Sequence, residues 1–346
     1  MVRGLLSFAI GGCALAHVTT AACADELPVR KPGLWEMKIV KVGSQLPALT
    51  TQQCTDPSVD KEMVNAGHIA TYNEGLAWAA GEYTVLLSAD DVLAPGALAR
   101  AVALLDSRAE VGFVYGHSIR FNGDTGVLPT ARMGPVKWEI WPGQEWLAVR
   151  CRAGHNSISS PEVVARTSLY RELGGYRAEL PHSGDLEIWM RFAAHRDVGY
   201  IAGADQAFYR IHAASMQSQW LTSKVAELRQ RKAAYDALFA AQSPAIRDAP
   251  RLHDLANRAL AKEALWRACR AFDRRRLVAE QAGDLVEFAQ DTYPAVTSLP
   301  EWRGWRRRTA LGPGLSGLLR PLRLPGLLRH RLQSWLWWRA WRLHGV

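Results

Sequence analysis

Two adjacent carboxylates, Asp90 and Asp91, follow directly after the apolar segment 83–87 and precede Pro95. A short apolar, β-branched run of this kind predicts a strand buried on both faces in a parallel sheet. Ligands of open α/β sheets collect at the carboxyl ends of strands, and hard divalent cations prefer carboxylate oxygens together with substrate phosphates. The pair is therefore a candidate metal-bound phosphate site. The alternative is that one carboxylate caps a helix that begins near Pro95.

Asp185 is the second residue whose position suggests chemistry. The segment 184–193 predicts a helix with one apolar stripe, formed by Leu186, Trp189, Met190 and Ala193. Asp185 lies in the first turn and off that stripe, where the helix amino end favours an ionised carboxylate. Such a carboxylate suits a general base. An ordinary first-turn aspartate is the alternative interpretation.

A cation and an imidazole end the apolar segment 207–212. Arg210 and His212 follow residues that predict a strand. A guanidinium can hold a phosphate, and one imidazole nitrogen can complete a metal site. A lone histidine is also common in sites without any ligand, so both interpretations stay open.

The order and spacing of these segments resemble the GT-A glycosyltransferases of family 2. Residues 88–91 are similar to the acidic pair of that family, and 174–176 (Gly-Gly-Tyr) to its glycine-rich loop. Residues 184–191 resemble its E-D-x-x-x-W-x-R element, with glycine where the family usually has glutamate, and 209–212 resemble its Tyr-Arg-x-His ending. The resemblance covers about residues 65–215.

This resemblance implies transfer of a sugar from a nucleotide-diphosphate sugar to an acceptor hydroxyl with inversion, using Mg²⁺ or Mn²⁺. The acceptor would be a glycan or a lipid-linked glycan. Asp185 would be the catalytic base, and Asp91 and His212 would hold the metal. The implied donor- and diphosphate-binding residues are Asp90, Arg210, Gly174 and Gly175.

The implied fold class is α/β: a Rossmann-like GT-A domain with a mostly parallel sheet, followed by a helical C-terminal region. The domain would occupy 64–220 and lack the first nucleotide-binding strands. Within it we expect helices over 66–81 and 95–105, strands at 111–116 and 118–121, and irregular chain over 127–160. Spaced leucines predict packed helices over 221–300.

The first 63 residues have a different character. Residues 1–24 match the charged, apolar and A-x-A regions of a secretory signal peptide. Residues 25–63 resemble the opening of a small family of bacterial exported proteins of unknown function, with a strand-like segment after Lys31. Cleavage after Ala24 would place the protein in the periplasm or outside the cell. An unused leader would leave it at the cytoplasmic face of the membrane.

The basic charge lies at the carboxyl end of the chain. The formal net charge is +9, and residues 301–346 alone contain ten arginines and one glutamate. Arginine beside tryptophan and leucine suits a membrane surface, while no apolar run is long enough to span a bilayer. A packed C-terminal helix is the alternative for this segment. Nucleic acid is not an expected partner, because no nucleic-acid-binding fold accompanies the charge.

Composition and cysteine spacing exclude other classes. Hydrophobic residues make up 48% of the chain and charged residues 22%, as in a globular protein rather than a disordered one. The five cysteines have no C-x-x-C spacing, so a zinc knuckle is not expected. Two other functions stay open: a non-catalytic exported relic or binding module, and a glycoside hydrolase that uses Asp185 with Asp90 or Asp91.

Overall fold

The computed structural model describes residues 33–39, 49–55, 67–88, 90–122, 128–212, 223–277, 280–318 and 324–346. The chain divides into two compact units, 1–75 and 76–346, and each is described by itself. The predicted leader, 1–24, lies outside the described residues. Its use and the predicted domain boundaries stay predictions.

The N-terminal unit contains one hairpin. Strands β1 (Gly33–Ile39) and β2 (Leu49–Thr55) pair antiparallel, with Gly33 opposite Thr55 and Ile39 opposite Leu49. Helix α2 (Gly67–Trp78) follows in the chain, within the range expected for a helix.

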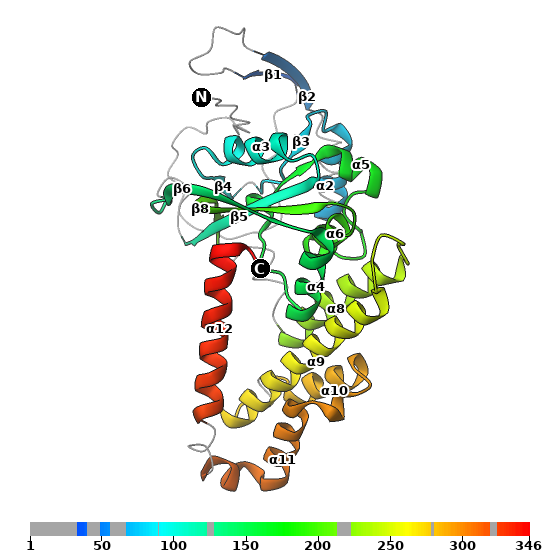
Figure 1. Ribbon diagram of the computed structural model, residues 1–346, viewed down its shortest axis with the longest axis vertical. Coiled ribbons are helices and arrows are strands. Elements are labelled where there is room, and N and C mark those ends of the chain that lie inside the picture. Colours follow the sequence, from blue (N-terminus) through cyan, green and yellow to red (C-terminus); the bar gives the residue numbers. More distant parts are fainter. Residues whose placement is uncertain are drawn as a thin grey trace. The chain divides into compact units, whose positions relative to one another are not determined.

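The larger unit contains a six-stranded sheet in the order β3-β7-β5-β8-β4, with β6 also paired to β8 (Figure 1). The strands are β3 (Tyr83–Thr84), β4 (Val92–Leu93), β5 (Val111–Phe121), β6 (Met133–Trp141), β7 (Val164–Arg166) and β8 (Asp197–Arg210). The α/β class with a helical C-terminal region is confirmed. The strand directions differ from the expected, mostly parallel sheet. Of the described pairs, β5–β8 alone is parallel, because β4, β6 and β7 run back against these two strands.

Three expected elements differ from the structure. The segment 83–87 forms a strand only at Tyr83–Thr84, at the sheet edge, and Leu87 is 38% exposed. Residues 111–121 form one strand instead of two, because the expected turn is a β-bulge near His117. The segment 127–160 contains β6 and helix α4 (Gly143–Ala153). Proline and exposed side chains gave β6 the composition of a loop, yet both are tolerated on a strand at the sheet margin.

Helices cover both faces of the sheet. On one face, α3 (Ala97–Ser107) packs Ala101, Leu104 and Leu105 against Val114 and Ile201. Phe113 points to the opposite face, since neighbouring residues of a strand alternate. There its ring meets Trp146 of α4 and Trp189 of α6 (Gly184–His195), at centroid distances of 5.7 and 5.6 Å. The apolar stripe predicted for α6 is buried as expected.

A helical region follows the sheet. It comprises α8 (Lys224–Ala240), α9 (Ala249–Asp273), α10 (Ala282–Thr292), α11 (Pro300–Leu318) and α12 (Leu324–His344), whereas the short α5 (Thr167–Leu173) belongs to the sheet domain. The packed helices expected over 221–300 are confirmed. Arg267 ties α8 to α9, since it pairs with Glu227 at 2.8 Å and with Glu263 at 2.6 Å.

The end of α12 packs onto the sheet (Figure 1). Trp341 is 4% exposed, and its ring lies against His117 and Tyr200. The hydroxyl of Tyr115 donates to the carbonyl of Gly345, which lies just beyond the helix. The C-terminal end is therefore a packed helix, one of the two interpretations of the tail. In the part of the chain that the structure describes, no helix is long and apolar enough to cross a membrane.

We predict that Trp341→Ala lowers the free energy of unfolding by about 3–5 kcal/mol, because it removes a buried indole and leaves a cavity. Trp335→Ala is the matched control on the same helix. Trp335 is 51% exposed, so its loss is expected to change stability by less than about 1 kcal/mol. Urea unfolding followed by circular dichroism measures both. Equal effects of the two variants would contradict the docking of α12 through Trp341.

Candidate active site

The β4–β8 ladder brings together the acidic pair and the residues that end β8. Val92 lies opposite Phe208 in this antiparallel pair, so the residues before Val92 run beside those after Phe208. The backbone N–H of Arg210 donates to Asp91 Oδ1 at 3.0 Å. His212 Nε2 lies 2.9 Å from Asp90 Oδ2. Two segments more than a hundred residues apart in the chain thus form one charged cluster.

The acidic pair does not cap the next helix. Helix α3 begins at Ala97, and its N-cap is Gly96, with φ 73° and no side-chain cap hydrogen bond. A positive φ is available to glycine at little cost. Because the carboxylates of Asp90 and Asp91 are instead directed at the end of β8, the capping alternative is wrong.

The Asp91 carboxylate is largely shielded from water. Its side chain is 7% exposed, and burial raises its pKa to about 6 against the lowering effect of the Arg210 N–H. The nearby charge of Asp90 raises the pKa further, and His212 lowers it. A buried carboxylate at the end of a strand, with a second carboxylate beside it, gains from a cation that neutralises it.

Asp185 lies in the first turn of α6, as expected. Its Oδ2 accepts a hydrogen bond of 2.7 Å from Ser160 Oγ, at the start of the short 3₁₀ helix η1 (Ser160–Glu162). This contact holds the carboxylate in one orientation. It also adds a hydroxyl next to the candidate base, which sequence reasoning had not included.

The Tyr209 phenol is influenced both by the acidic pair, Asp90 and Asp91, and by Asp185. Burial raises the pKa of its phenol, and the charges of Asp91, Asp185 and Asp90 act in the same direction while Arg120 opposes them. The phenol is therefore within electrostatic reach of all three carboxylates. The structure thus brings Asp185 into the same region as the acidic pair, although these residues are far apart in the sequence.

Glu162 is a buried acid that the sequence analysis missed. It is 2% exposed, and burial raises its pKa to about 8, so it is mostly protonated at neutral pH. Its Oε1 accepts the backbone N–H of Ser159 at 3.0 Å, which completes a capping box at the start of η1. The S-x-x-E pattern of residues 159–162 is the signal that could have identified it.

The glycine loop is held from behind by an arginine. Arg191 donates to the carbonyls of Gly174 and Gly175, both at 2.7 Å, and pairs with the fully buried Glu187 at 3.0 Å. Gly174 adopts a φ of 88°, and its N–H donates to Tyr170. The glycines therefore shape a turn whose carbonyls are occupied, and their contact with a donor stays a prediction.

Arg210 contacts the acidic cluster through its backbone. Its backbone N–H donates to Asp91. Its side-chain Nε is buried and has no hydrogen-bond partner among the described residues. An unsatisfied guanidinium nitrogen suits an anion that brings its own oxygens, as a phosphate does.

The acidic cluster fits a metal site that substrate and water complete better than a site made of protein ligands alone. Among the described residues, no group of three or more His, Cys, Asp and Glu side chains has the arrangement of a metal site. Mg²⁺ is commonly held by one or two carboxylates together with substrate phosphates and water. Asp91, with Asp90 and His212 beside it, can supply that share of the ligands.

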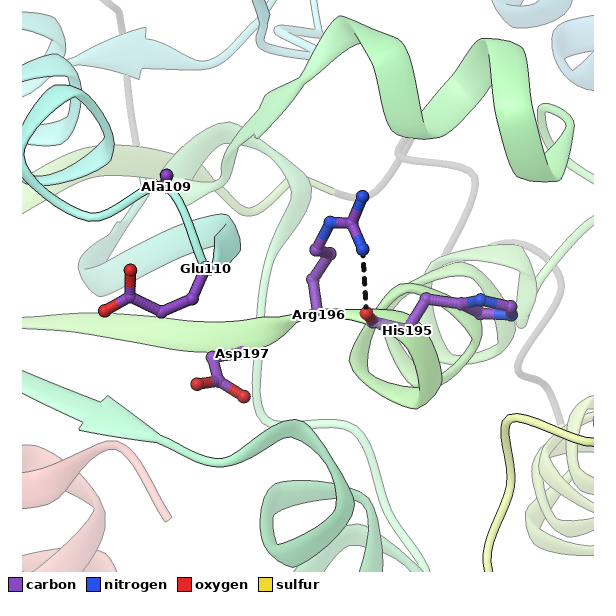
Figure 2. Close-up of a pocket in the computed structure, with 5 residues that line it drawn as sticks. All are labelled: Ala109, Glu110, His195, Arg196 and Asp197. Atoms are coloured by element: carbon purple, nitrogen blue, oxygen red, sulfur yellow. Dashed lines mark hydrogen bonds between the residues drawn. The ribbon is translucent and has the colours of Figure 1, made fainter.

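A surface hollow lies at the other end of the parallel strand pair. It is lined by Ala109, Glu110, His195, Arg196 and Asp197, and Figure 2 shows the Arg196 guanidinium donating to the carbonyl of His195. These residues precede or begin β5 and β8, whereas the acidic cluster lies at the end of β8. The hollow is therefore separate from the candidate site.

Comparison with known proteins supports the family resemblance. Residues 30–163 match the family described as glycosyl transferase family 2. The match begins before residue 65, where the predicted resemblance begins, and ends before Asp185 and His212. No curated protein matches the chain.

Solved structures of S. aureus TarS 1-349 are similar at low identity. The complex with UDP-GlcNAc is 15% identical over 71% of this chain and 72% of that chain, with a TM-score of 0.47. The complex with UDP is 13% identical over 78% of this chain and 80% of that chain, with a TM-score of 0.43. At these TM-scores the likeness carries no weight for fold or activity.

We predict that Asp91→Asn stabilises the protein in a pH-dependent way. Because the pKa of Asp91 is raised in the folded state, its contribution to stability is complete below about pH 4 and is lost as the pH rises through about 6. The asparagine cannot ionise and keeps an oxygen for the Arg210 N–H. At pH 7.5 we expect the variant to be more stable by about 1–3 kcal/mol, and at pH 4.5 by roughly a third of that amount. Urea unfolding at both pH values measures this. A variant that is less stable by the same amount at both would contradict it.

Proposed function

We propose that this chain, whose residues 30–163 match the family described as glycosyl transferase family 2, transfers a sugar from a nucleotide-diphosphate sugar to an acceptor hydroxyl with inversion. The observation that carries the proposal is the meeting of Asp90 and Asp91 with Arg210 and His212 at the end of β8. The cluster gathers carboxylate oxygens and an imidazole, which are ligands for the metal of a metal-bound diphosphate. A glycan or lipid-linked glycan is the proposed acceptor class.

The diphosphate of the donor would be held in two ways: by Arg210, and by the carboxylates through a bound metal ion. Arg210 would contact a phosphate through its unsatisfied guanidinium nitrogen, and Asp90 would face the ribose or the metal shell. Asp91 and His212 would hold Mg²⁺ or Mn²⁺, which supplies charge neutralisation for the leaving diphosphate when bound. The turn at Gly174 and Gly175 would close the site from the side of α6.

Asp185 would act as the general base. As the acceptor oxygen attacks the anomeric carbon, its proton passes to the Asp185 carboxylate and the bond from that carbon to the diphosphate oxygen breaks. The nucleoside diphosphate leaves with the electron pair. Attack opposite the leaving group inverts the configuration. Ser160 would orient Asp185, because its hydroxyl already donates to Oδ2.

We expect the purified full chain to release nucleoside diphosphate from a UDP- or GDP-sugar in the presence of Mn²⁺, and EDTA to abolish this release. Asp185→Asn should lower transfer about 10²–10⁴-fold, the usual effect of losing a general base, and leave donor binding in place. Asp91→Asn should weaken donor binding itself. Asp291→Asn, on the exposed face of α10, is the control and should change neither.

The same assay separates the alternatives. If no nucleotide-sugar is bound or hydrolysed and Asp91→Asn changes nothing, the protein is not a transferase and a non-catalytic binding module is favoured. Cleavage of a simple glycoside without nucleotide or metal, lost in Asp185→Asn, would instead identify a glycoside hydrolase.

We also expect the native N-terminus to retain the leader or begin elsewhere than Asp25, since nucleotide-sugars are cytoplasmic and the proposed site needs them. The proposed location is accordingly the cytoplasmic face of the membrane. Mass spectrometry of the native protein measures the N-terminus. A start at Asp25 would indicate export and would contradict a cytoplasmic transferase.

A further inference from the structure

Helix α12 (Leu324–His344) packs through one narrow face. His330, Trp337 and Trp341 follow helical spacing and lie on this inner face. The His330 ring stacks on Trp266 of α9 at 4.5 Å, and Trp337 meets the ring of His155 at 4.5 Å. With Trp341 against the sheet, the helix is fixed to the rest of its unit at both ends and between them. Its orientation about its own axis is thereby set.

The opposite face of α12 is apolar and exposed. Of the fifteen large hydrophobic residues exposed in the described chain, eight lie between 311 and 343. The six on α12 are Leu328, Leu332, Trp335, Leu336, Trp338 and Leu343, which are 44–63% exposed. Four of them are leucines that repeat with the helical period on the side away from Trp341. A contiguous apolar stripe of this kind marks an interaction surface.

Arginines accompany this stripe, and acids do not. Arg329, Arg331, Arg339 and Arg342 are exposed, and α12 contains no aspartate or glutamate. The Arg339 guanidinium lies 5.4 Å from the Trp335 ring. An indole with a guanidinium beside it matches the headgroup region of a bilayer, where rings anchor and cations meet phosphate.

We propose that the outer face of α12 docks in the headgroup plane of an anionic lipid bilayer. The leucine stripe would enter the boundary of the acyl chains, and the flanking arginines would meet the anionic headgroups. The charge pattern excludes a second copy of this chain as the better occupant. Two such faces would bring eight arginines together without a compensating acid on either helix. This proposal does not depend on the transferase activity.

The test is sedimentation of the full chain with vesicles of phosphatidylcholine alone and of phosphatidylcholine mixed with phosphatidylglycerol. We expect binding to the anionic vesicles to be more than about tenfold stronger and to weaken with added salt. Leu332→Asp should weaken it more than about tenfold, because a carboxylate then faces the acyl boundary. Leu277→Asp, at an exposed leucine outside α12, is the matched control and should bind as the wild type does.

A second pair of variants tests the charges. Arg339→Glu should weaken binding to anionic vesicles, whereas Arg258→Glu, at an exposed position on α9, should leave it unchanged. Circular dichroism establishes that the variants fold. Wild-type binding by Leu332→Asp, or equal binding to neutral and anionic vesicles, would overturn the proposal. So would a dimer in size-exclusion chromatography that Leu332→Asp dissociates, with no vesicle bound.

Discussion

The candidate site depends on the antiparallel pairing of β4 with the end of β8. Strand β4 is short, since it comprises only Val92–Leu93. The pairing nevertheless sets the register in which Asp90 and Asp91 run beside Arg210 and His212. A shift of one residue would turn each side chain to the other face of the sheet and separate the carboxylates from their partners. The register is also held just beyond β4, where the Ala94 N–H donates to the Gln206 carbonyl at 2.9 Å.

Burying the Asp91 carboxylate in this register costs free energy when it is ionised, and a bound cation can offset that cost. Asp91 and Glu162 are nearly inaccessible, and burial raises the pKa of both, to about 6 and about 8. They differ in their surroundings. Glu162 accepts the Ser159 N–H at the start of η1 and can stay protonated there. Asp91 accepts the backbone N–H of Arg210 and lies near a second carboxylate. A bound cation would lower its pKa and release the proton, so Asp91 is the residue of the two that favours a cation.

The sequence indicated that the candidate site residues follow apolar segments, but it did not indicate the sheet that positions them. Asp90, Asp91, Arg210 and His212 each follow an apolar segment, and that local signal survives in the structure. Strand direction is not a local property. Residues 83–87 have the composition of a central strand, yet most of the segment is not in the sheet, because pairing depends on distant residues such as Arg166 and Ala165. Sequence patterns also conceal residues whose role arises from packing. Glu187, buried between Arg177 and Arg191, is an example, since a charged residue in a helix usually faces solvent.

The two faces of α12 explain why the tail fitted two interpretations. Its arginines and tryptophans suit both a packed helix and a membrane surface, and composition alone does not say which residues face which side. The structure assigns the tryptophans at 337 and 341 to packing and leaves the leucine stripe outside. The C-terminal end also contacts the sheet. The Tyr115 hydroxyl of β5 donates to the Gly345 carbonyl, just past the end of α12. The same strand carries Arg120, whose charge acts on Tyr209 in the candidate site. Strand β5 therefore contacts the end of the C-terminal helix and also carries a charge that acts on the candidate site.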